Sequence, residues 1–169
     1  NENRLEIRSG RFRSTLSTLP AVDFPSVDQS SAEMTVDLDS KGFKKLLDQT
    51  AFAMAQQDVR YFLNGMLVEF GNNHVRAVAT DGHRLAMSDL EQEGIEGAIK
   101  QVIVPRKGVI EMQRLLQEVE DSVAVSIGSS HLCVSSSMFT LTTKLVDGKF
   151  PDYDRVIPKD GDKVVLADK

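Results

Sequence analysis

A β-rich segment passes directly into a helical pattern in the stretch Lys100-Gln101-Val102-Ile103-Val104-Pro105-Arg106-Lys107-Gly108-Val109-Ile110-Glu111. The apolar run before Pro105 is typical of a strand, and proline is common at the entry of a helix. From about Arg106 to Val119 the apolar residues recur at helical spacing. The basic residues of this segment fall on the opposite side, so we expect an amphipathic helix that lies on a sheet.

The same pattern occurs 66 residues earlier, where Lys41-Gly42 takes the place of Lys107-Gly108. A strand is predicted over residues 32–38, followed by an amphipathic helix from about Ser40 to Gln56, with Ser40 as a plausible N-cap. The apolar stripe of this helix consists of Phe43, Leu46, Leu47, Thr50 and Met54. The side facing away carries Lys41, Lys44, Lys45 and Asp48.

Three β-rich segments follow each helix. The first set covers residues 65–70, 74–80 and 83–88, and Asp81-Gly82 is a two-residue hairpin signal. The second set covers residues 122–127, 131–135 and 138–146. The predicted fold class is therefore α+β, a duplicated β-α-β-β-β unit with two helices packed on antiparallel sheets. Both helices are expected on the same side of one sheet.

The two copies differ in the connection that follows the helix. Their helices are 66 residues apart, but the turn glycines Gly71 and Gly128 are only 57 apart. The first copy therefore carries an insertion of nine residues, which includes Asp58–Asn64. An insertion in one copy of a repeat is typically a surface loop and often carries function.

Composition limits the class of protein. The chain has 169 residues, of which 41% are hydrophobic, and a single cysteine, Cys133. This indicates a globular domain with additional segments and excludes a disulfide scaffold. No signal peptide or membrane-length apolar run is present, so a cytoplasmic location is expected. The net charge of −5 argues against binding nucleic acid by bulk charge alone. Because the chain begins with Asn1 rather than Met, we expect a piece of a longer protein.

An enzyme is not expected. The three histidines show no metal-ligand spacing, and there is no glycine-rich phosphate loop. The most enzyme-like string is Thr80-Asp81-Gly82-His83-Arg84, but no nucleophile or second carboxylate is placed to complete a site. We therefore predict no catalytic residue, no metal and no cofactor. A small hydrolase that uses Asp81 and His83 is the enzymatic alternative.

Two binding surfaces are suggested by the residues themselves. The basic residues near the start of both helices would present a positive layer to phosphates without base specificity. Separately, apolar residues in loop-like segments lie next to Arg84 and Arg155, a pattern that suits capture of a short peptide. These apolar residues are Leu63, Leu85, Pro151 and Val156.

Four long motifs resemble the beta subunit of bacterial DNA polymerase III, the sliding clamp family. They are Asp58–Gly65 (DVRYFLNG), Ala79–Ala86 (ATDGHRLA), Val102–Glu111 (VIVPRKGVIE) and Lys144–Tyr153 (KLVDGKFPDY). The resemblance implies the DNA clamp fold, in which each subunit has three similar domains and two subunits form a head-to-tail ring around double-stranded DNA. It implies a processivity factor without catalytic activity.

The resemblance also implies a division of the chain. Residues 1–30 would be the C-terminal end of the first clamp domain, 31–156 the complete middle domain, and 157–169 the linker and the start of the third. A longer repeat agrees with this division, because Leu19, Phe24 and Pro25 recur 126 residues later as Leu145, Phe150 and Pro151.

Site residues follow from the matched motifs. The DNA contacts implied are Gln57, Tyr61, Phe62, Arg106 and Lys107, and Arg60 beside them is expected to join. Phe62 stands where relatives often have tyrosine. The groove that receives partner peptides would be formed by Leu63, Thr80, Gly82, His83, Arg84, Leu85, Pro151, Arg155 and Val156. Third-domain residues would complete it.

The implied partners are the DNA polymerase III alpha subunit, the clamp loader, and other polymerases and repair proteins that carry clamp-binding motifs. The intact protein would be a homodimer with no membrane association. A peptide-binding adaptor that never encircles DNA is the second hypothesis, and it has no need of a basic layer on the helices.

Overall fold

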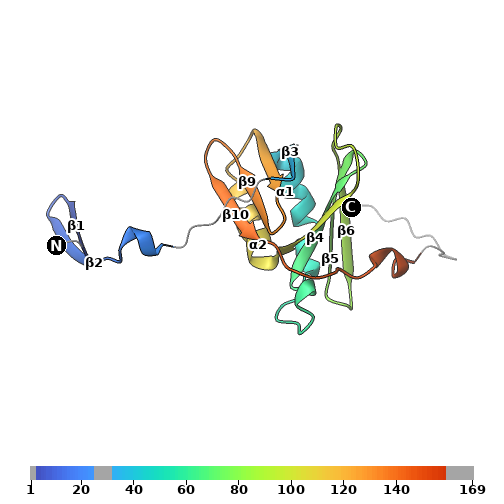
Figure 1. The fold of residues 1–169 in the computed structure, drawn as a ribbon, viewed down its shortest axis with the longest axis horizontal. Helices are drawn as coiled ribbons and strands as arrows, with labels where there is room; N and C mark the ends of the chain where they lie inside the picture. The colour runs from blue at the N-terminus through green and yellow to red at the C-terminus, as the bar shows by residue number, and fades with distance from the viewer. Residues whose placement is uncertain (1–2, 25–31, 159–169) are drawn as a thin grey trace, which may run out of the picture.

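The computed structural model describes residues 3–24 and 32–158. At the N-terminal end, β1 (Arg4–Ser9) and β2 (Phe12–Ser17) form an antiparallel hairpin, followed by the 3-10 helix η1 (Ala21–Asp23) (Figure 1). None of their residues is buried. Pro25, the boundary expected near residue 30 and residues 159–169 lie outside the described residues, so the predicted domain limits stay predictions.

The remaining elements repeat one order twice. The first copy is β3 (Met34–Asp39), α1 (Ser40–Asp48), β4 (Gly65–Gly71), β5 (His74–Thr80) and β6 (Leu85–Glu91). The second is β7 (Lys100–Pro105), α2 (Arg106–Leu116), β8 (Ser122–Ile127), β9 (His131–Ser135) and β10 (Thr140–Lys144). The duplicated β-α-β-β-β unit is therefore confirmed, as is the α+β class with two helices and antiparallel sheets.

The first strand of each copy pairs with the other copy. Strand β7 pairs with β4 in the sheet β6-β5-β4-β7, and β3 pairs with β8 in the sheet β10-β9-β8-β3. The expectation of a single sheet below both helices is therefore wrong. Hydrophobic periodicity assigns a strand to a face but does not choose its neighbour, and here the neighbours come from the opposite repeat.

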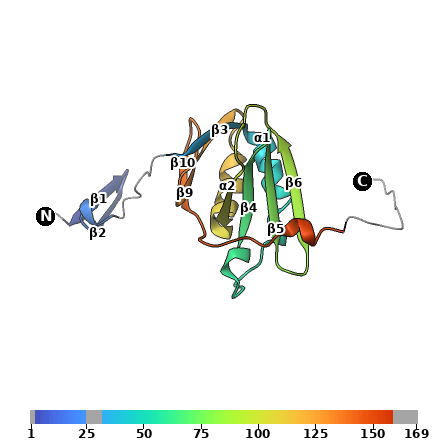
Figure 2. The ribbon, with the colours of Figure 1, turned by 45° about the vertical axis from the view of Figure 1, so that its right-hand side comes forward.

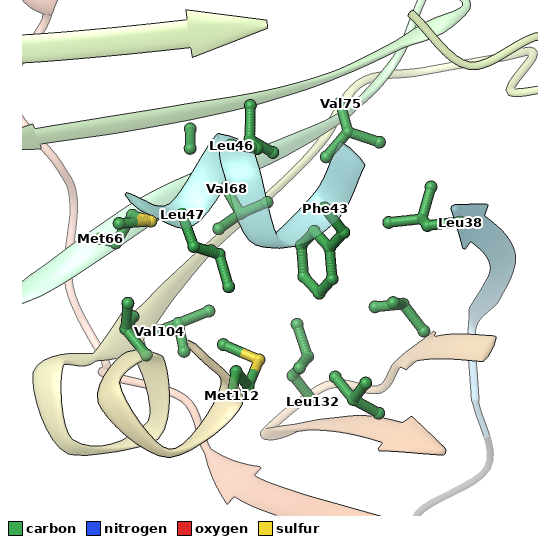
Figure 3. Packing of buried hydrophobic residues seen from close by; sticks show 14 of the residues in the cluster. Leu38, Phe43, Leu46, Leu47, Met66, Val68, Val75, Val104, Met112 and Leu132 are labelled. Atoms are coloured by element: carbon green, nitrogen blue, oxygen red, sulfur yellow. The ribbon is translucent and has the colours of Figure 1, made fainter. Parts of the chain in front are cut away.

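Both helices lie between the two sheets and pack against each other (Figures 1 and 2). The main core combines side chains of both helices with the inner faces of both sheets. Figure 3 shows this meeting point, where Phe43 of α1 and Met112 of α2 approach Leu132 of β9. Each of these three side chains is at most 1% exposed. The exchange of strands and this shared core join the two repeats into one unit.

The helix boundaries differ from the sequence prediction. Asp39, not Ser40, is the N-cap of α1, because its Oδ2 accepts a 2.7 Å hydrogen bond from the Gly42 amide. Ser40 is buried as the first helical residue and donates to the Val119 carbonyl at 2.9 Å. At the other end, the Thr50 hydroxyl donates to the carbonyl of Leu46, and the helix ends at Asp48 instead of Gln56. Helix α2 ends at Leu116, three residues before the expected end.

Several strand limits and one turn also differ, and β3 begins at Met34 instead of residue 32. Strand β6 begins at Leu85 instead of His83, and β10 covers only Thr140–Lys144 of the predicted 138–146. Thr80 pairs with Leu85, so the β5–β6 turn has four residues between the strands and not two. The inserted segment is also more than a surface loop, because it contains the 3-10 helix η3 (Tyr61–Leu63) and buries Leu63. A second 3-10 helix, η2 (Ala51–Ala53), lies earlier in the same connection, within the range predicted as the first α-helix.

A segment that we call the strap, residues 145–158, crosses the face of the β6-β5-β4-β7 sheet that is opposite the helices (Figure 2). It contains the 3-10 helix η4 (Tyr153–Arg155). Phe150 and Tyr153 of the strap are buried in a second cluster with Leu67, Val78 and Ile103 of the sheet. The sheet is therefore covered on both faces, which explains why every residue of β4 is buried.

Replacement of the α1 cap, Asp39→Ala, should lower the free energy of unfolding by about 1 kcal/mol, because the Gly42 amide loses its acceptor. The measurement is urea unfolding of the intact protein followed by circular dichroism. Asp37→Ala, at an exposed position two residues earlier on the same strand, is the matched control and should change stability by less than about 0.5 kcal/mol. Equal effects of the two changes would contradict the cap assignment.

Candidate functional site

A groove of about 580 Å³ lies where the inserted segment, the β5–β6 turn and the strap meet. This volume falls within the range of about 300–1,000 Å³ that is usual for ligand sites. Its lining consists of Arg60, Leu63, Thr80, Gly82, His83, Arg84, Leu85, Pro151, Val156, Ile157 and Pro158. Eight of the nine residues predicted for a peptide groove are therefore brought together around one cavity. That they bind a peptide stays a prediction.

The β5–β6 turn is shaped by two side chains of its own. Asp81 accepts hydrogen bonds at its Oδ1 from the backbone amides of His83 (2.9 Å) and Arg84 (3.0 Å). These bonds hold the pKa of the Asp81 carboxyl below its usual range. Thr80 accepts from the Gly82 amide and donates to the Arg84 carbonyl. Asp81 thus supports the backbone of the turn, and its acceptors are taken by amides and by Arg84, so this geometry does not favour the hydrolase alternative.

Arg84 ties the turn to η2. Its Nε lies 3.1 Å from Asp81 Oδ2, and its Nη2 donates to the Phe52 carbonyl at 2.7 Å. The guanidinium also lies over the Phe52 ring, 5.7 Å from the ring centroid, in a cation–π arrangement. Arg84 therefore forms one rim of the groove in a fixed position, although its side chain remains largely exposed.

Arg60, which was predicted as a DNA contact, also lines the groove, and its contact with DNA stays a prediction. Asp58 accepts from the Arg60 Nε at 3.0 Å, from its Nη2 at 2.8 Å and from its backbone amide at 2.8 Å. Arg60 Nη2 also donates to the Asp81 carbonyl at 3.3 Å. Because the guanidinium is held by these groups, it faces Gly82 and the groove.

Asn64 fixes the shape of the inserted segment from within. Its Oδ1 accepts from the Asp58 amide at 2.9 Å, and its Nδ2 donates to the Asp58 carbonyl at 2.8 Å. These two bonds close the loop that presents Arg60 at the groove, and they place Leu63, which is 1% exposed, below it.

Arg155 is the predicted groove residue that does not line this cavity. Its Nε pairs with Asp152 Oδ2 at 2.8 Å, and its side chain is 85% exposed. Arg60, Ile157 and Pro158 line the groove without having been predicted for it. Ile157 and Pro158 directly follow Val156 in the sequence. Their apolar character alone could have added them to the predicted groove residues.

The second candidate surface lies on the helices. Lys41 and Lys45 of α1 and Lys107 of α2 are exposed, whereas Arg106 is half-buried at the first position of α2. Lys44 pairs with Asp48 at 2.5 Å, and Arg114 pairs with Glu111 at 2.9 Å. Gln113 of α2 donates to Asp48 of α1 at 2.8 Å, so the two helices also meet on their polar sides. The exposed positive charge is therefore modest and is carried mainly by three lysines.

The inserted segment presents aromatic side chains. Tyr61 is 57% exposed, and its ring meets that of Phe62 edge-on with centroids 5.9 Å apart. Phe62 is half-buried and packs against the second cluster, so it offers less surface than Tyr61. Gln57 is exposed and has a φ of 56°. Their contact with DNA stays a prediction.

The family model described as "DNA polymerase III beta subunit, central domain" matches residues 37–152. The chain belongs to the DNA polymerase III beta subunit family. The matched range contains both helices and the pairing of the two repeats, and it ends within the strap.

Relatives of this family, the beta sliding clamps, match along the whole chain. The beta sliding clamp of Pseudomonas putida KT2440 is 50% identical over 169 residues, which are 100% of this chain and 46% of the relative. The crystal structure of the DNA polymerase III subunit beta from Pseudomonas aeruginosa superposes with a TM-score of 0.92 at 50% identity, covering 96% of this chain and 45% of that one. The chain thus spans less than half the length of these relatives.

A second structure of the Pseudomonas aeruginosa sliding clamp contains bound griselimycin. It matches with a TM-score of 0.90 at 50% identity, over 96% of this chain and 44% of that one. Within residues 3–24 and 32–158, no helix is long and apolar enough to span a membrane, and no three metal-ligating side chains are grouped to hold an ion.

The Asp58–Arg60 pair should be visible in a titration. The hydrogen bonds that Asp58 accepts from Arg60, together with the positive charge of Arg60, lower the pKa of Asp58 from 3.8 to about 2. A carboxyl whose pKa is lowered on folding stabilises the folded state above pH 3.8, and this contribution is lost as the pH falls through about 2.

The measurement is the pH dependence of the Asp58 carboxyl carbon shift by NMR, and Arg60→Gln should move the midpoint back toward 3.8. Arg155→Gln, which removes an exposed arginine paired with a different carboxylate, is the control and should leave the Asp58 midpoint in place. A midpoint near 3.8 in the unchanged protein would contradict the described pairing.

Proposed function

We propose that this chain is the central part of a DNA sliding clamp subunit, a processivity factor that encircles duplex DNA and tethers partner proteins through the groove. The intact subunit would have the length of its relatives, pair head to tail with a second copy and act in the cytoplasm during DNA replication. It would be a non-catalytic component of the DNA polymerase III holoenzyme. Family membership supports this proposal in general, and the groove carries its specific part.

The groove supports peptide capture because it leaves apolar surface uncovered beside two arginines, Arg60 and Arg84. Val156 is 67% exposed, and Leu85 is only partly buried although it faces an apolar wall. Exposed apolar surface with a polar rim is typical of a site that waits for a partner. The rim residues Arg60 and Arg84 are already held in place, so little side-chain entropy remains to be lost on binding.

This groove fits short motifs of the alpha polymerase subunit, the clamp loader, and other polymerases and repair proteins with clamp-binding motifs. An extended segment of a few residues can place apolar side chains against Leu63, Leu85 and Val156. Arg155 does not line the groove here, but its side chain is 85% exposed and can move toward such a ligand once its pair with Asp152 opens.

The helices support sequence-independent contact with DNA. Three exposed lysines on two adjacent helices provide a few phosphate contacts, and Tyr61 provides an exposed aromatic ring. A protein that keeps its DNA by encirclement needs only weak contacts, since many would make binding strongly salt-dependent and would hinder sliding. The net charge of −5 agrees with retention by topology.

A peptide-binding adaptor that does not encircle DNA is the second candidate function. The groove alone would serve it equally well. The exposed lysines of α1 and α2 favour the clamp, because an adaptor has no use for positive charge gathered on both repeat-related helices.

Griselimycin, which the structure of a relative contains, is proposed to occupy this groove. Truncation of the groove wall, Leu85→Ala, should then weaken binding of griselimycin to the intact subunit by about 2 kcal/mol, or roughly thirtyfold in Kd, as expected for an apolar anchor contact. Leu90→Ala is the matched control: Leu90 lies on the same strand with similar burial, but it packs against the core on the helix side. Isothermal titration calorimetry should find the control unchanged. An equal loss in both variants would count against the groove.

Charge reversal at Lys41→Glu with Lys107→Glu should reduce the salt dependence of DNA binding by the intact clamp. Each lost phosphate contact lowers the slope of log K against log salt by about 0.9, so the double variant should lose nearly two. Lys149→Glu, an exposed lysine on the strap, is the control and should leave the slope unchanged. If the strap variant lost as much, DNA would not lie on the helix side.

A further inference from the structure

The face of the sheet below the strap carries one continuous polar row. Asp89 of β6 lies opposite Arg76 of β5, Arg76 lies opposite Glu69 of β4, and Glu69 lies opposite Gln101 of β7. Residues in register across a sheet point to the same face. The row before it is apolar, with Met87, Val78, Leu67 and Ile103 in the same order of strands. Polar and apolar rows thus lie side by side beneath the strap.

Tyr153 of the strap reaches both rows. Its ring is buried in the second cluster with Leu67, Val78 and Ile103. Its hydroxyl donates to Glu69 Oε2 at 2.6 Å and lies 3.4 Å from Nη1 of Arg76. The ring of Tyr153 packs on the apolar row while its hydroxyl binds the polar row, so the two rows together fix the position of this side chain on the sheet.

Glu69 depends on that hydroxyl. Glu69 is 5% exposed, and its two carboxylate oxygens accept from Gln101 Nε2 at 2.5 Å and from Tyr153. Arg76 is held in turn by Asp89, at 2.6 Å and 3.1 Å. Burial raises the pKa of Tyr153, Arg76 opposes this, and Glu69 adds to it. A buried carboxylate that loses one of two donors is costly, so the whole network favours a closed strap.

The strap has few other attachments to the sheet. Its first residues are bound by the backbone, since the Leu145 amide donates to Ser130 and the Val146 amide donates to Ile103. In the described part of the strap beyond Val146, the backbone bonds are internal ones, from the amides of Val156 and Ile157 to the Tyr153 carbonyl. The far half, which includes the groove residues Val156, Ile157 and Pro158, is therefore anchored through side chains, with Tyr153 immediately before it.

We propose that Tyr153 is a positioning residue for the partner groove: its hydroxyl, bound to Glu69 and Arg76, fixes the strap on the sheet and so holds the apolar wall formed by Val156, Ile157 and Pro158. One wall of the groove thus belongs to the strap, whose position depends on this hydroxyl. The effect on partner binding rests on the proposed function of the groove, whereas the role of the Tyr153 hydroxyl in holding the strap on the sheet does not.

The test is Tyr153→Phe in the intact subunit, which keeps the ring and removes only the hydroxyl. Amide exchange of Val156 and Ile157 without ligand should become about tenfold faster, because a hydrogen bond to a charged group is lost and the strap opens locally. The Kd for griselimycin should rise by a similar factor. Leu85 remains in place in this variant, so a weaker Kd would report the position of the strap.

Ser40→Ala is the matched control. It also removes one buried hydroxyl hydrogen bond, to the Val119 carbonyl, but it lies in the main core away from the strap. It should lower thermal stability while leaving strap exchange and griselimycin binding unchanged. If Tyr153→Phe fails to fold, Glu69→Gln provides the same test, because it removes the buried charge and should change exchange in the same direction by a smaller factor.

Three outcomes decide the matter. Faster strap exchange with weaker griselimycin binding supports the proposal. Unchanged exchange and binding in Tyr153→Phe, with only a lower melting temperature as in Ser40→Ala, overturns it. If the unchanged protein does not bind griselimycin, the proposed groove function fails instead, and strap exchange alone still decides whether Tyr153 fastens the strap.

Discussion

The pairing of each repeat's first strand with the other repeat is the constraint on which the structure depends. Strand β3 completes the sheet of the second copy, and β7 completes the sheet of the first. Helix α1 directly follows β3 and helix α2 directly follows β7, so both helices lie in the space between the two sheets. A repeat of this kind cannot bury its apolar faces alone, and the exchange makes both copies members of one core.

The insertion in the first copy breaks the symmetry of the repeat, and the candidate groove forms there. Between α2 and β8 the chain needs only a short connection, whereas between α1 and β4 it forms η2 and η3 and presents Arg60, Tyr61 and Leu63. The strap then covers the β6-β5-β4-β7 sheet. The groove therefore forms on the face opposite the helices, which leaves the lysines of α1 and α2 on a separate surface. Partner capture and DNA contact are proposed to use these two surfaces without competing for one.

Much of this was predictable from the sequence, and the failures have identifiable causes. Apolar periodicity and turn glycines located the strands and both helices, because burial imposes those periods directly. The exchange of β3 and β7 was missed because periodicity assigns a face and not a neighbour. Asp39 and Ser40 are adjacent cap-forming residues, and only the geometry distinguishes the one that accepts from Gly42. The turn at Asp81-Gly82 is longer than predicted because the Asp81 carboxylate accepts hydrogen bonds from two backbone amides of the turn itself.

The site residues show the same limit. Five of the eight groove residues were suggested by apolar residues that lie beside arginines, and the full set came from a family resemblance, which carries positions but not the orientation of a long side chain. Arg60 turned to the groove because of Asp58, and Arg155 turned away because of Asp152. Glu69 and Tyr153 gave no signal in the sequence, since a glutamate within a strand ordinarily faces solvent. Only the strap, which packs on that face, makes this carboxylate part of a buried network.

Retention of DNA by topology is the central claim, and one measurement tests it most directly. The intact protein would be loaded by its clamp loader onto a nicked circular plasmid, separated from free protein by gel filtration, and followed after the plasmid is cut to a linear form. The account predicts that the bound protein is lost on linearisation, because a ring held by topology slides off the ends while a few lysine contacts cannot retain it. Persistence on the linear DNA at the same salt concentration would contradict the account, since the protein would then grip DNA directly.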